Sequence, residues 1–333
     1  FQFRDEFVGR LLALFFRHDL NQHAKAVFFD GAAAAAERAG LPPLLIGMLV
    51  IGFGSSMPEM VISGLSASQG NSGLALGNAF GSNITNIALI LGLTAAISPI
   101  RVESSILRRE LPLLAFVTLT AAALLYVDGA LSRTDGWLLI GLFVVIMAWS
   151  IHAGVNNKTD HLAVMVEQEL QAPMSMARAI TYVVFGLILL VISSQILVWG
   201  GVEIARALGI SDLIIGLTVV AVGTSLPELA ASIAAVRKNE HDLALGNIIG
   251  SNLFNTSIVI GITGTIGPTI LEPGILSRDL PVLGILTAAL FLMGYAFRER
   301  TAGIISRLEG VLLLIAYLIY NAGLVLAVIN TKS

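Results

Sequence analysis

Two stretches of this sequence are nearly the same: residues 46–59 read IGMLVIGFGSSMPE, and residues 215–228 read IGLTVVAVGTSLPE. A second matching pair follows at the same distance, LALGNAFGSNITN at residues 74–86 and LALGNIIGSNLFN at residues 243–255. Each copy contains one glutamate and several small or polar residues in an otherwise apolar setting. Such a repeat inside a hydrophobic chain predicts a transporter built from two related halves.

The repeat is longer than its two motifs. Between Leu44 and Gly92, 19 of 49 positions are identical to the residues 169 positions later, without a gap. The same register continues to Pro112 and Pro281, so the repeating unit is about five helices long. An odd number of spans forces the second copy to enter the membrane in the opposite direction. We therefore expect an all-α membrane protein of ten transmembrane helices, arranged as two inverted five-helix repeats.

Composition also places the chain in a lipid bilayer. Of its 333 residues, 56% are hydrophobic and 12% are charged, about half the charged fraction of an average soluble domain. Nine apolar stretches reach the length of about 20 residues that a bilayer requires, at 41–70, 73–97, 111–127, 134–153, 179–200, 211–236, 243–267, 280–297 and 304–330. The formal charge of −3 argues against a nucleic-acid partner. The absence of cysteine excludes disulfides, thiol catalysis and thiolate metal sites.

The repeat divides the chain into two domains and a linker. The N-terminal repeat is expected at residues 1–153, with its motif region at 46–92, and the C-terminal repeat at 178–333, with its motif region at 215–261. A polar linker at residues 154–177 joins them on the cytoplasmic side.

The first of the ten spans is degraded. Residues 12–29 correspond to the apolar run 181–198, yet they contain Arg17, Asp19 and Lys25. We therefore expect a short first helix or an aberrant N-terminus.

Basic residues indicate the orientation in the membrane. The connections after odd-numbered spans contain 11 lysines and arginines, and those on the other side contain 4, apart from the N-terminal tail. Because cytoplasmic loops are rich in lysine and arginine, both termini are expected outside the cytoplasm.

Glu59 and Glu228 occupy the same place in the two copies, near the middle of the membrane. Glu59 lies twelve residues before Asn71, the polar end of its span, which is roughly 18 Å along a helix in a core about 30 Å thick. A charged side chain there costs about 2.5–3.5 kcal/mol to insert. No lysine, arginine or histidine is predicted at the same depth. We interpret both carboxylates as groups that hold a cation or a proton.

Neighbouring residues supply neutral oxygen atoms. Pro58 and Pro227 cannot donate to the carbonyls of Gly54 and Gly223, so each helix should break there and expose main-chain oxygen. Hydroxyl groups lie in the same turn, on Ser55, Ser56, Thr224 and Ser225. In the following span a polar stripe recurs every four residues, at Asn78, Ser82 and Asn86 and at Asn247, Ser251 and Asn255.

Oxygen ligands of this kind suit Ca²⁺, Na⁺ or Mg²⁺, whereas Zn²⁺ and Cu²⁺ favour nitrogen or sulfur. Two carboxylates match the charge of one divalent ion. Six or more oxygens from a broken backbone favour Ca²⁺ over Mg²⁺, which requires a tight octahedron. The ions are expected as transported substrates, and no cofactor is implied.

At this point the motifs resemble those of a known family. GSSMPE at residues 54–59 and GTSLPE at residues 223–228, each followed by GN and GSNxxN, resemble the alpha-1 and alpha-2 repeats of the cation/Ca²⁺ exchanger superfamily. The bacterial and archaeal Na⁺/Ca²⁺ exchanger branch is the most similar, from about Phe29 onward. The resemblance implies a multi-pass protein of the plasma membrane, the inner membrane of a bacterium. It also implies a ten-helix fold with four central cation sites, across which the first and sixth spans slide during alternating access.

The resemblance further implies ligands for each ion. Glu59 and Glu228 are similar to Ca²⁺ ligands, assisted by the main-chain oxygens of Ser55 and Thr224. Na⁺ ligands would be the hydroxyls of Ser56, Ser82, Ser225 and Ser251, with the carbonyls of Gly52 and Ala221. Some relatives carry aspartate where Asn255 stands, whereas Asn86 and Asn255 are both neutral here.

Several functions remain open after these observations. Antiport of Ca²⁺ against Na⁺ is favoured by the hydroxyl pairs before each glutamate, and a Ca²⁺/H⁺ antiporter of the same fold is the alternative. A membrane enzyme is disfavoured because a serine nucleophile needs a base, and all five histidines lie in the tail, the linker or a loop. An inactive relative with an interaction role is supported only by the weak first span. The oligomeric state is open, and a monomer is the simplest expectation.

Overall fold

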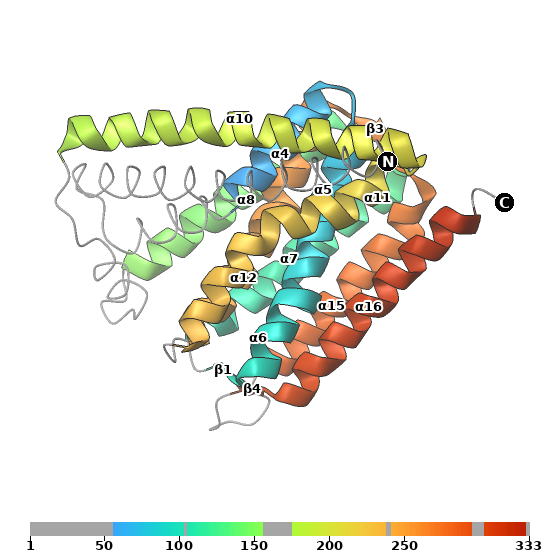
Figure 1. The fold of residues 1–333 in the computed structure, drawn as a ribbon. Coiled ribbons are helices and arrows are strands. Elements are labelled where there is room, and N and C mark those ends of the chain that lie inside the picture. Colours follow the sequence, from blue (N-terminus) through green and yellow to red (C-terminus); the bar gives the residue numbers. More distant parts are fainter. Residues whose placement is uncertain (1–55, 103–104, 156–174, 238–240, 295–302, 331–333) are drawn as a thin grey trace, which may run out of the picture.

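The computed structural model describes residues 56–102, 105–155, 175–237, 241–294 and 303–330, which are mostly helical (Figure 1). The label η marks a π-helical turn. The elements are α4 (Met57–Ser68), α5 (Ser72–Ile84), η2 (Thr85–Leu91), α6 (Gly92–Ile97), β1 (Ile100–Val102), α7 (Ser105–Asp128), β2 (Ala130–Leu131), α8 (Arg133–Val155), α10 (Met176–Leu208), α11 (Asp212–Ile215), η3 (Gly216–Val220), α12 (Ala221–Arg237), α13 (His241–Phe254), η4 (Asn255–Val259), α14 (Ile260–Ile266), β3 (Thr269–Ile270), η5 (Ile275–Asp279), α15 (Leu280–Gly294), β4 (Gly303–Ile305) and α16 (Arg307–Asn330).

The two spans that carry the asparagine motifs form the centre of the molecule. One runs through α5, η2 and α6 from Ser72 to Ile97, and the other includes Ala244–Ile266 of α13, η4 and α14. Both are long and apolar enough to cross a membrane, yet most of their residues are buried. They are therefore surrounded by other helices, which brings their polar side chains close to one another.

The outer helices have the opposite character. Glu110–Asp128 of α7 and Arg307–Ile329 of α16 are also long and apolar enough to cross a membrane, but most of their residues are not buried. Large apolar side chains of α16 face outward, among them Leu312, Leu318 and Ile319. A surface of this composition suits contact with lipid.

The expected seventh span is bent. Asp212–Leu226 and Ala231–Arg237 together form a fifth candidate membrane span, with an angle of 47° between them. Pro227 lies at the bend, yet α12 continues from Ala221 to Arg237. The predicted break is therefore a bend, as proline commonly produces. In the first half, Pro58 lies in the first turn of α4, where its missing N–H leaves no gap in the helix.

The predicted first span and residues 156–174 of the linker predicted at 154–177 lie outside the described residues, whereas α8 extends to Val155 and α10 begins at Met176. Gly52 and Ser55 also lie outside the described residues.

Glycines allow corresponding helices to approach closely in the two halves. A Cβ on Gly136 of α8 would lie 2.7 Å from the carbonyl oxygen of Gly261, and one on Gly310 of α16 would lie 2.7 Å from that of Gly92. Gly92 and Gly261 are 169 residues apart, whereas Gly136 and Gly310 are 174 apart. The contact of α8 with α14 is thus equivalent to that of α16 with α6. The spacing between equivalent residues of the two halves increases from 169 at Gly92 to 174 at Gly136.

Two short antiparallel sheets connect the halves. β1 pairs with β4 through Ile100–Ile305, Arg101–Ile304 and Val102–Gly303. β2 pairs with β3 through Ala130–Ile270 and Leu131–Thr269. The sheets lie toward opposite ends of the helices in Figure 1. Each sheet therefore fastens a strand from the first half to one from the second half.

The sixth span is longer than expected. It was predicted at residues 179–200, but α10 extends over 33 residues from Met176 to Leu208, roughly 50 Å at 1.5 Å per residue. Figure 1 shows it crossing the neighbouring helices obliquely. Such a tilt accommodates a helix that is longer than the apolar thickness of a bilayer.

A hydrogen bond to a buried carboxylate joins η5 to α16. Arg278 lies 2.7 Å from the Asp279 carboxylate, and the hydroxyl of Tyr320 donates to the same carboxylate at 2.9 Å. Asp279 is fully buried and Tyr320 is nearly so. The carboxylate is thereby satisfied by a charged and a neutral donor, as a buried charge requires.

Candidate ion-binding site

The two repeated glutamates are buried near the central helices. Glu59 of α4 is 1% exposed and Glu228 of α12 is 2% exposed. Both follow a proline at the motif position described above, in equivalent helices of the two halves. Two carboxylates with almost no access to solvent are costly to keep charged unless positive charge is bound nearby.

Two asparagines fix the backbone that carries these glutamates. Asn78 Nδ2 donates to the main-chain oxygen of Glu59 at 3.3 Å and to Ser63 Oγ at 3.0 Å. Asn247 Nδ2 makes the equivalent bonds, to the main-chain oxygen of Glu228 and to Ser232 Oγ, both at 3.4 Å. Each asparagine therefore holds its helix against the glutamate helix of the same half.

Ser63 and Ser232 were not among the residues predicted for the site. Both follow their glutamate by four residues, so they lie on the same helix face. This shared spacing in the two copies is the sequence signal that could have identified them.

Thr224 connects the two halves at the centre. Its Oγ1 atom lies 3.4 Å from Ser82 Oγ, 3.3 Å from Asn78 Oδ1 and 3.2 Å from the main-chain oxygen of Ala221. Ser82 and Asn78 belong to α5, whereas Thr224 and Ala221 belong to α12. Three predicted site residues, Ser82, Ala221 and Thr224, are thus neighbours in the structure.

Other predicted hydroxyls are buried in the same region of the chain. Ser56 and Ser225 are 0% and 1% exposed, and their Oγ atoms have no hydrogen-bond partner among the described residues. Ser251 is 2% exposed. The buried hydroxyl oxygens of Ser56 and Ser225 are therefore available to a cation that has lost its hydration shell.

The asparagines after these serines cross between the halves. Asn86 Nδ2 donates to Asn252 Oδ1 at 3.1 Å, and Asn83 Nδ2 donates to Thr256 Oγ1 at 2.7 Å. η4 begins at Asn255 and η2 begins one residue before Asn86. π-helical turns of this kind frequently occur at functional sites.

The donor set is rich in oxygen and contains few charges. Within the parts of the chain that the structure describes, no three histidine, cysteine, aspartate or glutamate side chains gather to hold a metal ion. The charge of the region therefore comes from the two glutamates, and hydroxyl, amide and main-chain groups surround them. This chemistry suits a hard cation such as Na⁺ or Ca²⁺ and does not suit Zn²⁺.

Comparison with known proteins agrees with this chemistry. The sequence matches the sodium/calcium exchanger protein family over residues 23–152 and 178–326. CaxA of Alkalimonas amylolytica is 44% identical over 295 residues, which cover 88% of this chain and 92% of that protein. Inner membrane protein YrbG of Escherichia coli is 42% identical over 247 residues, covering 73% of this chain and 76% of that protein.

A more distant relative and a solved structure carry exchanger names. Sodium/calcium exchanger MaX1 of Methanosarcina acetivorans is 28% identical, with 88% of this chain and 92% of that protein covered. The structure of the sodium-calcium exchanger NCX_Mj soaked with Na⁺ and Sr²⁺ superposes with a TM-score of 0.65 at 30% identity. The superposition covers 95% of this chain and 97% of that one.

Proposed function

Because this chain belongs to the sodium/calcium exchanger family, we propose that it is a secondary antiporter that moves Ca²⁺ against Na⁺ across a membrane. The observation that carries the proposal is the pair of buried glutamates, Glu59 and Glu228, one from each copy of the motif. Their combined charge balances one Ca²⁺. Neutral oxygens around them can take part in binding Na⁺.

The predicted ligands are divided between the two ions by charge. Glu59 and Glu228 would bind Ca²⁺, together with main-chain oxygens of Ser55 and Thr224. Na⁺ would use neutral oxygens, on Ser56, Ser82, Ser225, Ser251, Asn86, Asn255, Gly52 and Ala221. The short distances from Thr224 to Ser82 and Asn78 of the other half support a common site formed by both halves.

Exchange against protons is the second candidate. Two carboxylates alone could release Ca²⁺ on protonation, without any need for hydroxyl ligands. The buried hydroxyls of Ser56 and Ser225, which have no hydrogen-bond partner among the described residues, favour Na⁺ because a proton would make no use of them.

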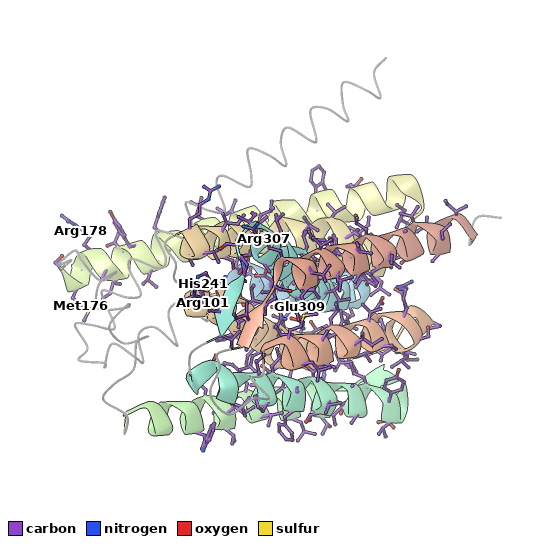
Figure 2. All side chains as sticks on the ribbon, turned by 90° about the horizontal axis from the view of Figure 1, so that it is seen from below. Arg101, Met176, Arg178, His241, Arg307 and Glu309 are labelled. Atoms are coloured by element: carbon purple, nitrogen blue, oxygen red, sulfur yellow. The ribbon has the colours of Figure 1, made fainter. Side chains whose placement is uncertain are left out.

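We propose ten spans in two inverted repeats for the complete architecture. The equivalent glycine contacts of α8 with α14 and of α16 with α6 support it, as do the two sheets that join the halves. Figure 2 labels Arg101, His241 and Arg307 close to the β1–β4 sheet. Basic residues at this end support its assignment to the cytoplasmic side of an inner membrane.

Alternating access follows from the charge of the site. Binding one Ca²⁺ or several Na⁺ neutralises the carboxylates and permits the change between inward-facing and outward-facing states. An empty site leaves two buried negative charges without a bound cation, which opposes the change. Net transport then requires one ion to exchange for the other.

Flux into proteoliposomes tests the proposal. Vesicles loaded with Na⁺ and diluted into Na⁺-free buffer should take up radioactive Ca²⁺. A matched set of vesicles with a pH gradient but no Na⁺ gradient should not. Uptake driven only by the pH gradient would assign the protein to Ca²⁺/H⁺ exchange, and no uptake in either set would contradict both candidates.

Neutralising either glutamate should abolish the flux. Glu59→Gln and Glu228→Gln keep the shape of the side chain but remove a charge that Ca²⁺ requires, so we expect uptake to fall to background with the protein still folded. Asp128→Asn, at the exposed end of α7, is the matched control and should retain uptake. Exchange that survives in either glutamate variant would contradict the assignment.

A further inference from the structure

The asparagines of the central helices make unequal contacts. Asn86 bonds to Asn252, and Asn83 bonds to Thr256, so two hydrogen bonds join the α5–η2 stretch to the α13–η4 stretch. All four side chains are at most 1% exposed. Asn255 is 0% exposed, and neither its Oδ1 nor its Nδ2 has a hydrogen-bond partner within the described part of the chain.

The repeat identifies the bond that is missing. At a spacing of 169 residues, the counterpart of Asn86 is Asn255 and the counterpart of Asn252 is Asn83. If the two halves made the same contacts, Asn255 Nδ2 would donate to Asn83 Oδ1. Both of those atoms lack a partner among the described residues. The amide of Asn83 is held instead by Thr256, at 2.7 Å.

Thr256 is the residue that makes the halves differ here. Its counterpart in the first half is Ile87, whose side chain cannot accept a hydrogen bond. The hydroxyls of Thr94 and Thr263 each donate to the main-chain oxygen of the residue four positions earlier. This hydrogen bond is common for threonine in membrane helices. Thr256 lies in the π-helical turn η4, where the hydrogen-bond pattern changes, and its hydroxyl accepts from the other half.

We propose that Thr256 is a positioning residue for Na⁺ binding: by holding the amide of Asn83, it leaves the carboxamide of Asn255 free to coordinate the ion. The inference rests on the proposed Na⁺/Ca²⁺ exchange. It assigns different tasks to Asn86, which is held by Asn252, and to Asn255, which is not held.

The physical reason is the cost of a buried amide. A carboxamide buried without hydrogen bonds destabilises the ion-free protein. A cation bound to Oδ1 of Asn255 recovers part of that cost. If Asn255 instead donated to Asn83, the ion-free form would gain a hydrogen bond and the plane of the carboxamide would be fixed. The direction of its Oδ1 would then be set by that bond, and turning Oδ1 to any other direction would break the bond.

Two substitutions at one position test the idea by flux. Thr256→Val removes the hydroxyl and keeps the shape of the side chain, whereas Thr256→Ser keeps the hydroxyl. We expect Thr256→Val to raise the Na⁺ concentration for half-maximal Ca²⁺ uptake by about 2- to 10-fold, the factor that one net hydrogen bond provides. The Ca²⁺ concentration for half-maximal uptake should stay unchanged, and Thr256→Ser should behave like the parent.

The Asn83→Ala variant shows whether Thr256→Val acts through Asn83 or disturbs the protein in a general way. Thr256 acts through Asn83, so Thr256→Val should cause no further shift when it is added to Asn83→Ala. A Na⁺ requirement that is unchanged or lowered in Thr256→Val would overturn the proposal. The proposal would also be overturned if Thr256→Val raised the Na⁺ concentration for half-maximal uptake equally in the parent and in Asn83→Ala.

Thermal unfolding of the purified protein tests, independently of transport, whether Asn83 and Asn255 form a hydrogen bond. In the parent chain the effects of Asn83→Ala and Asn255→Ala on Tm should add, because no bond joins the two residues. In the Thr256→Val background the two effects should not add, because the bond between them can form. Additive effects in both backgrounds would overturn the inference. Absence of Na⁺-driven uptake in the parent would instead refute the proposed function.

Discussion

Tyr320 satisfies a carboxylate that has no contact with water. Its hydroxyl donates to Asp279 at 2.9 Å, beside the pair that Asp279 forms with Arg278. A hydrogen bond to a charged group contributes about 1.5–3 kcal/mol. We expect Tyr320→Phe to lower the free energy of unfolding by about that amount, as measured by denaturation in detergent. Tyr317→Phe in the same helix is the matched control, and equal losses in the two variants would contradict the prediction.

Glu272 links stability to pH. Loss of water by burial and then the nearby carboxylate of Asp212 raise the pKa of Glu272 above its ordinary value of 4.5. Its folded-state pKa therefore exceeds its unfolded value. The contribution of this carboxyl to stability is complete below pH 4.5 and is lost as pH rises through the folded-state pKa.

Glu272→Gln should remove the loss of stability that this carboxyl causes as pH rises. We expect the variant to be at least as stable as the parent near neutral pH, and its Tm should fall less than that of the parent as pH rises from 4.5. Unfolding temperatures across a pH series in detergent measure this, with Asp128→Asn as the control. Parallel profiles for Glu272→Gln and the parent would refute it.

At the scale of residues, the sequence predicts which residues belong to the site better than it predicts which residues bond to one another. Glu59 and Glu228 could be singled out because both copies contain them at a depth where a charge is costly. The bond between Asn83 and Thr256 could not, because the position equivalent to Thr256 holds Ile87. A repeat draws attention to residues that agree, and this contact depends on a residue that differs.

At the scale of elements, α5 and η3 touch backbone to backbone. A Cβ on Gly77 would clash with the carbonyl oxygen of Leu213 in α11 and would lie 2.9 Å from Cα of Gly216, and one on Gly216 would lie 2.5 Å from the carbonyl oxygen of Leu74. No real Cβ sits so close to a backbone atom, so a larger residue would force the two helices apart. The helices meet beside Asn78 and Thr224, which lie 3.3 Å apart, so the separation would reach the site.

Gly216→Ala should therefore reduce both stability and transport. We expect a loss of about 1–3 kcal/mol, as for other overpacked contacts, together with reduced Ca²⁺ uptake. Gly141→Ala in α8 is the matched control, since it is exposed and has no atom within 4 Å of the added Cβ. The control should gain about 0.5–1 kcal/mol from its better helix propensity. A Gly216→Ala variant as stable as the control would show that the helices can separate without cost.

Hydropathy could predict the helical spans but not their details. The stretches at 73–97 and 243–267 agree closely with the central helices Ser72–Ile97 and Ala244–Ile266. The π-helical turns inside them could not be predicted, because a change in backbone hydrogen bonding leaves the apolar pattern intact. The two-residue strands were missed for another reason: they exist only through partners far away in the chain.

At the scale of the whole molecule, the principal contacts run between the halves. Both sheets pair a strand of the first half with one of the second, and α8 and α16 each pack against a central helix of the opposite half. The repeat could predict two related units, because the motifs are nearly identical. It could not predict how they interlock, since that depends on which helix faces meet in three dimensions.

The hydrogen bond between Asn86 and Asn252 also sets a demand on synthesis, because 166 residues separate its two ends. Ribosomes add about 5–20 residues per second, so the amide of Asn86 must wait roughly 8–33 s for its partner to be made. During that interval the first central helix has left the ribosome with a polar stripe that later becomes buried. The insertion machinery, or water within it, must shelter that stripe from lipid until the second half arrives.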